Sequence, residues 1–484
     1  MKLGTIFSAV PASLAEQPVT GFAIDHRKVA PGTVFGAFRG SRFNGEDFIE
    51  GAVQAGAIAV VAAPDAPVPA SVAHIADDEP RRAFAQGAAR YFRPVPGTVA
   101  AVTGTNGKTS TAEMTRQLWH MAGHGAASIG TLGVTTSFDQ NRTGLTTPDI
   151  VTFLSNMSGL ARQGVSHAIF EASSHGLSQY RTEGLSVKIT AFTNFSRDHL
   201  DYHGTMEAYF AAKMRLFDEV VDADGSVVIW ADDPKSIEVQ ERCEARGLKV
   251  LTVGEAGDDI VLESRTPTQL GQVLMVEYEG KTYRIALPLI GAYQAANALT
   301  AAGIALASGG EPQQVFDHVA RLQPVRGRLE RAVICANGAP VYVDYAHTGD
   351  ALASAIAALR PHVGGQLICV FGAGGDRDTG KRAEMGRIAH DNADRVVVTD
   401  DNPRGEDPAA IRGEILAAAP DAEDIGDRRT AIARAIELAG PDDIILLAGK
   451  GHEQGQIVGR GEEERVLPFD DVEVARQVAG EAVV

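Results

Sequence analysis

Residues 104–110, with the sequence GTNGKTS, are the strongest candidates for chemistry in this chain. Residues 99–102 are apolar and predict a buried strand before them, and a helical pattern follows. Such a turn offers backbone N–H groups to an anion, Lys108 can reach the outer phosphates, and Thr109 or Ser110 can ligate magnesium. A valine replaces the first glycine of the full Walker sequence, but the flanking strand and helix argue against a chance Gly-Lys-Thr. The segment predicts a nucleotide site.

Further polar residues follow other predicted strands. They are Glu171, Ser173 and His175, then Asn194, Asp198, His199, Asp201 and His203, then Asp344 and His347, Arg377, residues 400–404 and residues 450–453. Each group by itself is equally well explained as ordinary caps and turns. Because ligands bind beyond the carboxyl ends of strands in an open parallel sheet, the whole set indicates one ligand-binding edge in each sheet.

Glu171 and His199 are candidate magnesium ligands, since a bound nucleotide needs a metal to neutralise its phosphates. Histidine is an unusual ligand for this hard ion, so a hydrogen-bonding role for His199 is the alternative. Lys213 lies in the predicted helix EAYFAAKMRLF, where a lysine is ordinarily a solvated surface residue.

The elements that must position these residues fall into about three domains for a chain of 484 residues. The Pro-rich segment 93–97 predicts one boundary, and the start of a new strand series after residues 326–330 predicts the other. Beyond it, four apolar runs alternate with helical patterns and predict a doubly wound parallel sheet. The predicted fold is α/β, with domains at residues 1–96, 97–330 and 331–484.

Composition excludes several classes of protein. A net charge of -18 argues against a general nucleic-acid binder or a protein of anionic membranes. The first 17 residues make a poor signal peptide, and no apolar run reaches membrane-spanning length, so we expect a cytoplasmic protein. The three cysteines, Cys243, Cys335 and Cys369, are widely spaced and suggest neither a disulfide framework nor a zinc site.

Nine motifs in order along the chain resemble the Mur ligase family. They are GTNGKTS, LTTPD (145–149), EASSHGLSQYR (171–181), TNFSRDHLDYHGTMEAYFAAK (193–213), PVRGRLE, VDYAHT, FGAGGDRDTGKR, DDNPR and GKGHE. The resemblance covers nearly the whole chain and is most specific from residue 98 onward. Within the family it is closest to the type that adds the third amino acid to UDP-N-acetylmuramoyl-L-alanyl-D-glutamate.

The resemblance implies a small N-terminal α/β domain that binds the UDP substrate, a central P-loop domain that binds ATP, and a C-terminal Rossmann-like domain that binds the incoming amino acid. ATP would phosphorylate the D-glutamate carboxylate, and the amine would attack the acyl phosphate. The implied catalytic residues are Lys108, Glu171, His199 and Lys213. Two magnesium ions are implied, with Thr109, Glu171, His199 and a carbamylated Lys213 as ligands.

The resemblance also implies the ligand contacts. Those for ATP are Gly104, Thr105, Asn106, Gly107, Lys108, Thr109, Ser110, Asn297, Arg328 and Asp344. Those for the UDP-sugar peptide are Ile24, His26, Thr146, Thr147, Ser173, Gln179 and Arg181. His26 stands where many relatives have serine, and Tyr293 and Gln294 depart from the usual Phe-Asn pair near Asn297.

For the incoming amino acid the implied pocket is Arg377, Asp401, Asn402, Pro403, Arg404, Gly449 and Glu453. In the family, arginine at the position of Arg404 marks enzymes that take meso-diaminopimelate. An arginine can hold the second carboxylate of this substrate bidentately, and Glu453 would pair with its distal ammonium. We therefore expect diaminopimelate, because lysine would leave Arg404 without its anion.

Several alternatives remain. One is the lysine-adding ligase; a ligase that adds D-Ala-D-Ala and a folylpolyglutamate synthase are more distant, and DDNPR and GKGHE count against both. A catalytically inactive nucleotide-binding regulator would be expected to have lost Lys108, Glu171, His199 or Lys213, and all four are intact. The expected partners are small molecules, with no nucleic acid and no membrane insertion, and the expected state is a monomer.

Overall fold

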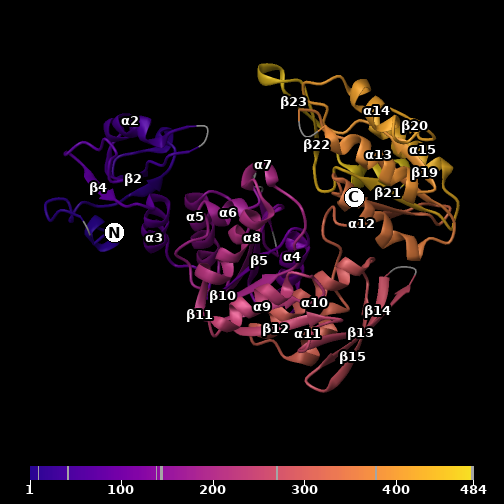
Figure 1. Cartoon of the computed structure of the whole chain (residues 1–484), viewed down its shortest axis with the longest axis horizontal. Coiled ribbons are helices and arrows are strands. Elements are labelled where there is room, and N and C mark those ends of the chain that lie inside the picture. Colours follow the sequence, from indigo (N-terminus) through magenta and orange to yellow (C-terminus); the bar gives the residue numbers. More distant parts are fainter. Residues whose placement is uncertain are drawn as a thin grey trace. The chain divides into compact units, whose positions relative to one another are not determined.

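The computed structural model describes residues 1–8, 10–40, 43–137, 139–141, 145–268, 271–376 and 379–480. The chain divides into two compact units (Figure 1). The first comprises Met1–Leu262, Glu277–Gly280 and Asn297–His318, and the second comprises Glu263–Val276, Lys281–Ala296 and Val319–Val484. None of the helices in the described ranges is long and apolar enough to cross a membrane.

The first unit begins with a parallel sheet of four strands in the order β1-β2-β3-β4. Its elements are α1 (Leu3–Ile6), β1 (Gly21–Ala23), β2 (Thr33–Gly36), α2 (Ile49–Gln54), β3 (Ala57–Ala62), β4 (Ala73–Ala76) and α3 (Pro80–Tyr91). Proline at the start of α3 suits its first turn, where the missing N–H has no partner to lose. Phe84 of α3 packs edge-on against Phe22 of β1 and joins helix to sheet.

A second, larger sheet carries the phosphate loop near its middle. Within the first unit its strand order is β12-β11-β10-β5-β9-β6-β7-β8, with the first three residues of β13 beside β12, and it is parallel except for the β6-β7-β8 end. The strands are β5 (Thr98–Thr103), β6 (Ala126–Gly130), β7 (Gly133–Thr135), β8 (Gln140–Asn141), β9 (His167–Glu171), β10 (Val187–Phe192), β11 (Val221–Trp230), β12 (Lys249–Gly254) and β13 (Ile260–Thr268). The central position of β5 explains its apolar sequence, because both of its faces are covered.

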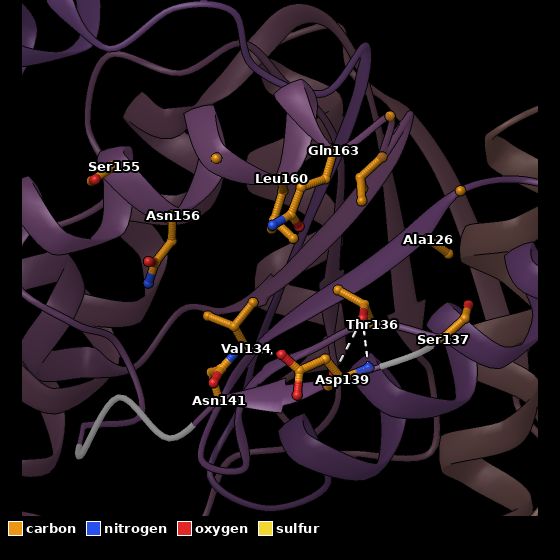
Figure 2. Close-up of a pocket in the computed structure, with 14 residues that line it drawn as sticks. Ala126, Val134, Thr136, Ser137, Asp139, Asn141, Ser155, Asn156, Leu160 and Gln163 are labelled. Atoms are coloured by element: carbon orange, nitrogen blue, oxygen red, sulfur yellow. Dashed lines mark hydrogen bonds between the residues drawn. The ribbon is translucent and has the colours of Figure 1, made fainter.

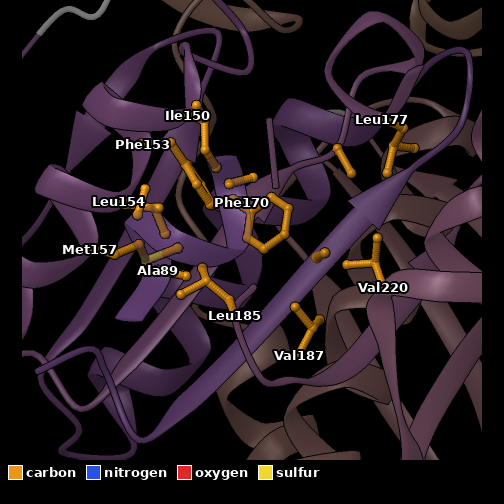
Figure 3. Close-up of a cluster of buried hydrophobic side chains, with 14 of the residues drawn as sticks. Ala89, Ile150, Phe153, Leu154, Met157, Phe170, Leu177, Leu185, Val187 and Val220 are labelled. Atoms are coloured by element: carbon orange, nitrogen blue, oxygen red, sulfur yellow. The ribbon is translucent and has the colours of Figure 1, made fainter. Parts of the chain in front are cut away.

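Helices connect these strands and cover the sheet (Figure 1). They are α4 (Lys108–Met121), α5 (Ile150–Arg162), α6 (Ser174–Ser178), α7 (Leu200–His203), α8 (Met206–Arg215), α9 (Ser236–Ala245), α10 (Ala292–Ala307) and α11 (Pro312–Val319). Figure 3 shows part of the core, in which Phe153 of α5 meets Phe170 of β9 edge-on at 5.0 Å between ring centroids. Ala89 of α3 belongs to the same cluster, so the small N-terminal sheet shares a core with the larger one.

The second unit contains a six-stranded sheet in the order β16-β17-β21-β18-β19-β20, parallel except for its edge strand β16. Its strands are β16 (Glu330–Ile334), β17 (Pro340–Asp344), β18 (Leu367–Phe371), β19 (Arg395–Val398), β20 (Glu423–Asp424) and β21 (Ile444–Ala448). Strands β14 (Gly271–Tyr278) and β15 (Lys281–Leu287) precede it, and the hairpin β22 (Gly455–Val458) and β23 (Arg465–Pro468) follows it. Its helices are α12 (Gly349–Leu359), α13 (Gly380–Asn392), α14 (Pro408–Leu416), α15 (Arg428–Leu438) and α16 (Asp471–Val478).

Alternate residues of β18 point into two different cores of this sheet. Cys369 and Phe371 belong to one buried cluster, whereas Ile368 and Val370 belong to the other. Helices therefore cover both faces, which confirms the predicted α/β class and the doubly wound C-terminal sheet. The four apolar runs of the sequence are the four central strands β17, β18, β19 and β21.

Candidate functional site

The turn from β5 into α4 has the backbone conformation of an anion cradle. Gly104 has φ +149° and Gly107 has φ +84°, a region that side chains disfavour. A Cβ on Gly104 would collide with the Thr193 hydroxyl, and one on Gly107 would collide with the amide oxygen of Asn297. Thr193 and Asn297 therefore pack closely against the loop, and the N–H groups of the loop lie at the N-terminus of a 14-residue helix.

Neighbouring strands hold the rest of this loop. Thr105 N donates to the Asn194 backbone carbonyl at 2.9 Å, and Asn106 N donates to the Asn194 side-chain oxygen at 2.8 Å. The Lys108 ammonium folds back to donate to the carbonyls of Gly104 and Thr105, both at 2.8 Å. The loop is thus fixed by the segment that follows β10, the parallel neighbour of β5.

Glu171, at the end of β9, is buried beside the first turn of α4. Its Oε2 accepts hydrogen bonds from the hydroxyls of Thr109 at 3.1 Å and Thr131 at 3.2 Å. Its Oε1 accepts one from Thr131 N at 2.7 Å. Thr109 and Ser110 are themselves buried at the start of α4. A carboxylate and a hydroxyl side by side are the hard oxygen donors that magnesium prefers.

Lys213 is a buried residue of α8, with 1% of its surface exposed, so it is not a solvated surface lysine. Its ammonium donates to the Gly104 carbonyl at 2.6 Å, the same oxygen that Lys108 contacts, and lies 4.5 Å from the centre of the Tyr209 ring. Burial, and next the charge of Lys108, hold the pKa of Lys213 well below its usual value. The neutral amine is thereby favoured.

His199 is the N-cap of α7 and has a left-handed backbone, with φ 51°. Its backbone N–H donates to the Asp198 carboxylate at 2.8 Å, and its ring packs edge-on against the ring of His175, with centroids 4.9 Å apart. Within the described ranges, no three His, Cys, Asp or Glu side chains lie close enough together to hold a metal ion. The predicted ligands Glu171 and His199 are therefore not a complete metal site by themselves.

Several of the predicted UDP-substrate residues form one hydrogen-bonded group around Thr147. Its hydroxyl donates to the Glu171 backbone carbonyl at 2.7 Å and lies 2.9 Å from the hydroxyl of Ser173, which caps α6. The Arg181 guanidinium donates to the Thr147 carbonyl at 2.8 Å and to the Gln179 side-chain oxygen at 2.7 Å. Thr146 lies 3.1 Å from the hydroxyl of Thr131, which links this group to Glu171.

The two predicted uridine contacts lie after β1. Ile24 is 38% exposed, a large fraction for an apolar side chain. His26 stacks on Phe48 with ring centroids 4.4 Å apart and planes 4° from parallel. These residues lie on the small N-terminal sheet, and neither is in the hydrogen-bonded group around Thr147.

The predicted adenosine and phosphate contacts are divided between the two units. Asn297 is in the first unit, where its side-chain oxygen accepts a hydrogen bond from Thr111 at 3.5 Å. Asp344 ends β17 in the second unit and accepts hydrogen bonds from Leu329 N at 2.7 Å and Ala346 N at 2.9 Å. Burial raises the pKa of Asp344, against the opposing charge of Arg328, whose guanidinium lies over the Tyr345 ring at 4.8 Å.

The predicted amino-acid pocket follows β19 and β21, two strands of the C-terminal sheet. Asn402 Nδ2 donates to Glu453 at 2.9 Å, and Arg404, with φ 51°, donates from its guanidinium to the Gly375 carbonyl at 2.9 Å. Gly449 has φ +110°, and a Cβ there would lie 2.9 Å from the Asp401 carboxylate.

The buried Pro403 contributes its carbonyl, which accepts from Glu406 N at 3.1 Å. Arg377 lies outside the described residues.

Three residues that contact the predicted site are absent from the implied ligand contacts, although Lys450 belongs to the polar group 450–453 that follows a predicted strand. Thr131 holds both oxygens of Glu171, Tyr209 faces the Lys213 ammonium, and Lys450 is buried beneath Asp401 and Asn402. Thr131 and Tyr209 carry no sequence signal of their own. Lys450 does, because a lysine directly after an apolar strand and between two glycines is a candidate for a buried cation.

A pocket of about 490 Å³ lies elsewhere in the first unit, between the start of β6, the β7–β8 hairpin and α5 (Figure 2). Val134, Asn156 and Gln163 are among its lining residues. None of the predicted site residues lines it, and it lies at the amino ends of β6 and β9 rather than at their carboxyl ends. It is therefore separate from the phosphate loop.

Comparison with known protein families gives three consecutive matches. Residues 18–93 match the model described as "Mur ligase family, catalytic domain", residues 102–305 match "Mur ligase middle domain", and residues 327–451 match "Mur ligase, glutamate ligase domain". The order of the matches confirms an architecture of three domains. The boundaries at residues 96 and 330 remain predictions.

Individual relatives extend over nearly the whole chain. The chain is 59% identical over 478 residues to a UDP-N-acetylmuramoyl-L-alanyl-D-glutamate–2,6-diaminopimelate ligase of Zymomonas mobilis, covering 98% of each sequence. It is 50% identical to the protein of the same name from Bradyrhizobium diazoefficiens, covering 96% of each. A solved structure of a ligase with this name superposes with a TM-score of 0.75 at 33% identity, covering 99% of this chain and 98% of the other.

Proposed function

Because this chain belongs to the Mur ligase family, we propose that it joins meso-diaminopimelate to UDP-N-acetylmuramoyl-L-alanyl-D-glutamate, with cleavage of ATP to ADP and phosphate. The observation that carries the proposal is the convergence of Lys108 and Lys213 on the Gly104 carbonyl of the phosphate loop, beside the buried Glu171. The ammonium of Lys108 suits the phosphates of ATP, and the neutral amine favoured at Lys213 suits formation of a carbamate.

The reaction overcomes a simple chemical obstacle. A carboxylate oxygen is a poor leaving group at neutral pH, so the D-glutamate carboxylate first attacks the γ-phosphorus of ATP. A phosphorus–oxygen bond forms to the carboxylate as the bond to ADP breaks. The neutral amine of the incoming amino acid then attacks the acyl carbon, phosphate leaves, and the nitrogen loses a proton. Lys108 and the N–H groups of the loop stabilise charge on the transferring phosphoryl group.

The residues around Glu171 fit magnesium. The carboxylate and the Thr109 hydroxyl are hard oxygen donors at the first turn of α4, and His199, which precedes α7, would add a nitrogen. Magnesium, when bound there with ATP, would neutralise phosphate charge. The absence of a complete group of three ligands within the described ranges agrees with a site that ATP and a carbamate must complete.

Lys213 fits the role of the carbamylated residue. Carbon dioxide reacts with a neutral amine, and the depressed pKa of Lys213 favours this form. The product is an anion beside the ammonium of Lys108, so carbamylation adds an attraction where a protonated Lys213 would be repelled. This role also explains why a lysine is buried in α8.

The two substrates other than ATP have separate groups of residues. The group around Thr147, with Arg181, Gln179 and Ser173, is suited to the peptide and diphosphate part of the UDP substrate, and Ile24 and His26 to its uridine part. In the second unit, Arg404 would bind the distal carboxylate of diaminopimelate and Glu453 its distal ammonium, beside Asn402. Arg328, Asp344 and Asn297 would contact ATP. We propose that the protein acts in the cytoplasm and as a monomer.

The test is ATP-dependent ligation with purified protein, magnesium and the UDP-muramoyl dipeptide, with meso-diaminopimelate and L-lysine offered in parallel while ADP and tripeptide are followed. We expect product with diaminopimelate alone. Arg404→Met should raise the KM for diaminopimelate by about tenfold or more, whereas Arg434→Met, which breaks an exposed ion pair in the same unit, should not. Preference for lysine would support the lysine-adding ligase, and ATP binding without amide formation would support a regulator.

A further inference from the structure

Lys450 is a fully buried cation in the segment that follows β21, with 0% of its side chain exposed. A lysine is rarely buried to this extent unless its ammonium is paired and hydrogen-bonded. Here the ammonium donates to the side-chain oxygen of Asn402 at 3.1 Å and to the Gly455 carbonyl at 2.9 Å. It also lies 3.2 Å from the carboxylate of Asp401 and 4.0 Å from that of Glu453.

These contacts fix the orientation of the Asn402 amide. Its oxygen accepts hydrogen bonds from Lys450 and from Ile457 N at 2.9 Å, so its NH₂ group is directed to Glu453 at 2.9 Å. A reversed amide would place NH₂ against two donors. Lys450 and the Ile457 N–H therefore together orient the Asn402 amide toward Glu453.

Lys450 also compensates the acidic charge of the pocket. Asp401 is 6% exposed, and its Oδ1 lies next to Lys450 without a hydrogen-bond donor of its own. Without this cation, Asp401 and Glu453 would be two neighbouring carboxylates in a buried region, which is unfavourable.

The same ammonium connects this pocket to the β22–β23 hairpin. Lys450 donates a hydrogen bond to the carbonyl of Gly455, the first residue of β22. This hairpin in turn contacts the backbone of Arg404. Arg404 N donates to the Ile457 carbonyl at 3.0 Å, and Gly459 N donates to the Arg404 carbonyl at 2.8 Å. Arg404 has the left-handed φ of 51°, a conformation that an arginine keeps only under external restraint.

We infer that Lys450 is a positioning residue for the incoming diamino acid: it orients Asn402, neutralises Asp401 and anchors the hairpin that holds the backbone of Arg404. The inference rests on the proposed function, in which Asp401, Asn402, Arg404 and Glu453 bind diaminopimelate. It adds a residue that contacts Asp401, Asn402 and Glu453 directly and reaches Arg404 through the hairpin.

The test compares Lys450→Met with Lys450→Arg and with Arg434→Met as a control for loss of a cation in the same unit. We expect Lys450→Met to raise the KM for meso-diaminopimelate by about 10- to 100-fold and to leave the KM values for ATP and the UDP substrate within about twofold of wild type. Lys450→Arg should recover part of the loss, because it retains the charge. If Lys450→Met does not fold, Lys450→Gln takes its place, since it keeps a donor but no charge.

The outcomes separate the inference from the function on which it rests. If the wild-type protein does not ligate diaminopimelate, the proposed function itself is contradicted. Wild-type ligation together with an unchanged KM for diaminopimelate in Lys450→Met would overturn the inference alone. Equal increases in all three KM values would overturn it as well, because they would indicate general loss of structure.

Discussion

At the scale of single residues, environment rather than residue type gives the site its chemistry. Lys213 is an ordinary lysine by sequence, but burial and the charge of Lys108 depress its pKa. Glu453 is an ordinary glutamate, but burial raises its pKa, against the opposing effects of Asn402 and Lys450. Each shift makes a prediction that can be measured.

Removal of the Lys213 amine should abolish the carbamate and lower kcat by about 100-fold. The matched control is Lys188→Ala, because Lys188 is an exposed lysine that pairs with Asp222 and Asp224 at the surface. Labelled bicarbonate should give a carbamate carbon signal in the wild-type protein and none in Lys213→Ala. Full activity of Lys213→Ala, or activity that does not respond to removal of carbon dioxide, would contradict the role of this residue.

Glu453 should make diaminopimelate binding depend on pH. The carboxylate form pairs with the substrate ammonium, and a raised pKa means that protonation begins at a higher pH than for an ordinary glutamate. The KM for diaminopimelate should therefore rise as the pH falls through this raised pKa, with the KM for ATP as the internal control. In Glu453→Gln this rise should be absent; its persistence there would assign the titration to another group.

At the scale of elements, the phosphate loop works through backbone conformation. Gly107 stands at the N-terminus of α4, and Gly123 follows its C-terminus with a similar φ of +89°. A Cβ on Gly107 would collide with Asn297, whereas a Cβ on Gly123 meets nothing within 4 Å. Alanine at Gly123 therefore tests only the cost of a positive φ. Alanine at Gly107 tests that cost together with the collision in the phosphate loop.

Alanine at either glycine should lower the free energy of unfolding by about 1–2 kcal/mol, because both positions have positive φ. Gly107→Ala should in addition weaken ATP binding by about tenfold or more, since the collision displaces the loop. Gly123→Ala should bind ATP as the wild type does. Chemical denaturation and calorimetric titration measure the two effects, and equal ATP affinities for the two variants would count against the loop as the nucleotide site.

At the scale of the whole molecule, the predicted site residues are divided between two compact units. Lys108, Glu171 and Lys213 belong to the first, and Asp344 and the pocket around Arg404 belong to the second. In each sheet they follow the carboxyl ends of parallel strands, where the strand order of an open sheet leaves room for a ligand. Ligand binding should therefore stabilise the folded chain as a whole.

ATP with magnesium at 100 times its dissociation constant should raise the free energy of unfolding by about 2.7 kcal/mol. Thermal unfolding with and without the nucleotide measures this gain. Chelation of magnesium should reduce it, because the phosphates then lose their counter-charge. Lys108→Ala should also reduce it, and an unchanged gain in this variant would place the nucleotide elsewhere.

The sequence by itself determined the family, the α/β class and the positions of the strands that carry the site. This was possible because these features depend on local patterns: apolar runs predict buried strands, GTNGKTS predicts a loop between strand and helix, and DDNPR and GKGHE follow strands of the last domain. The predicted helix after the loop ends at Met121, and Gly123 follows it as expected for a cap.

Tertiary structure alone decided how individual side chains are used. Burial of Lys213 depends on the packing of α8 against the phosphate loop. The two hydrogen bonds from Thr131 to Glu171 form because β6 and β9 are neighbouring strands. The position of Lys450 beside Asp401 and Asn402 depends on two segments that are about 50 residues apart in sequence. Contacts of this kind leave no local pattern, because their energy comes from the desolvation and pairing of groups that only the folded chain brings together.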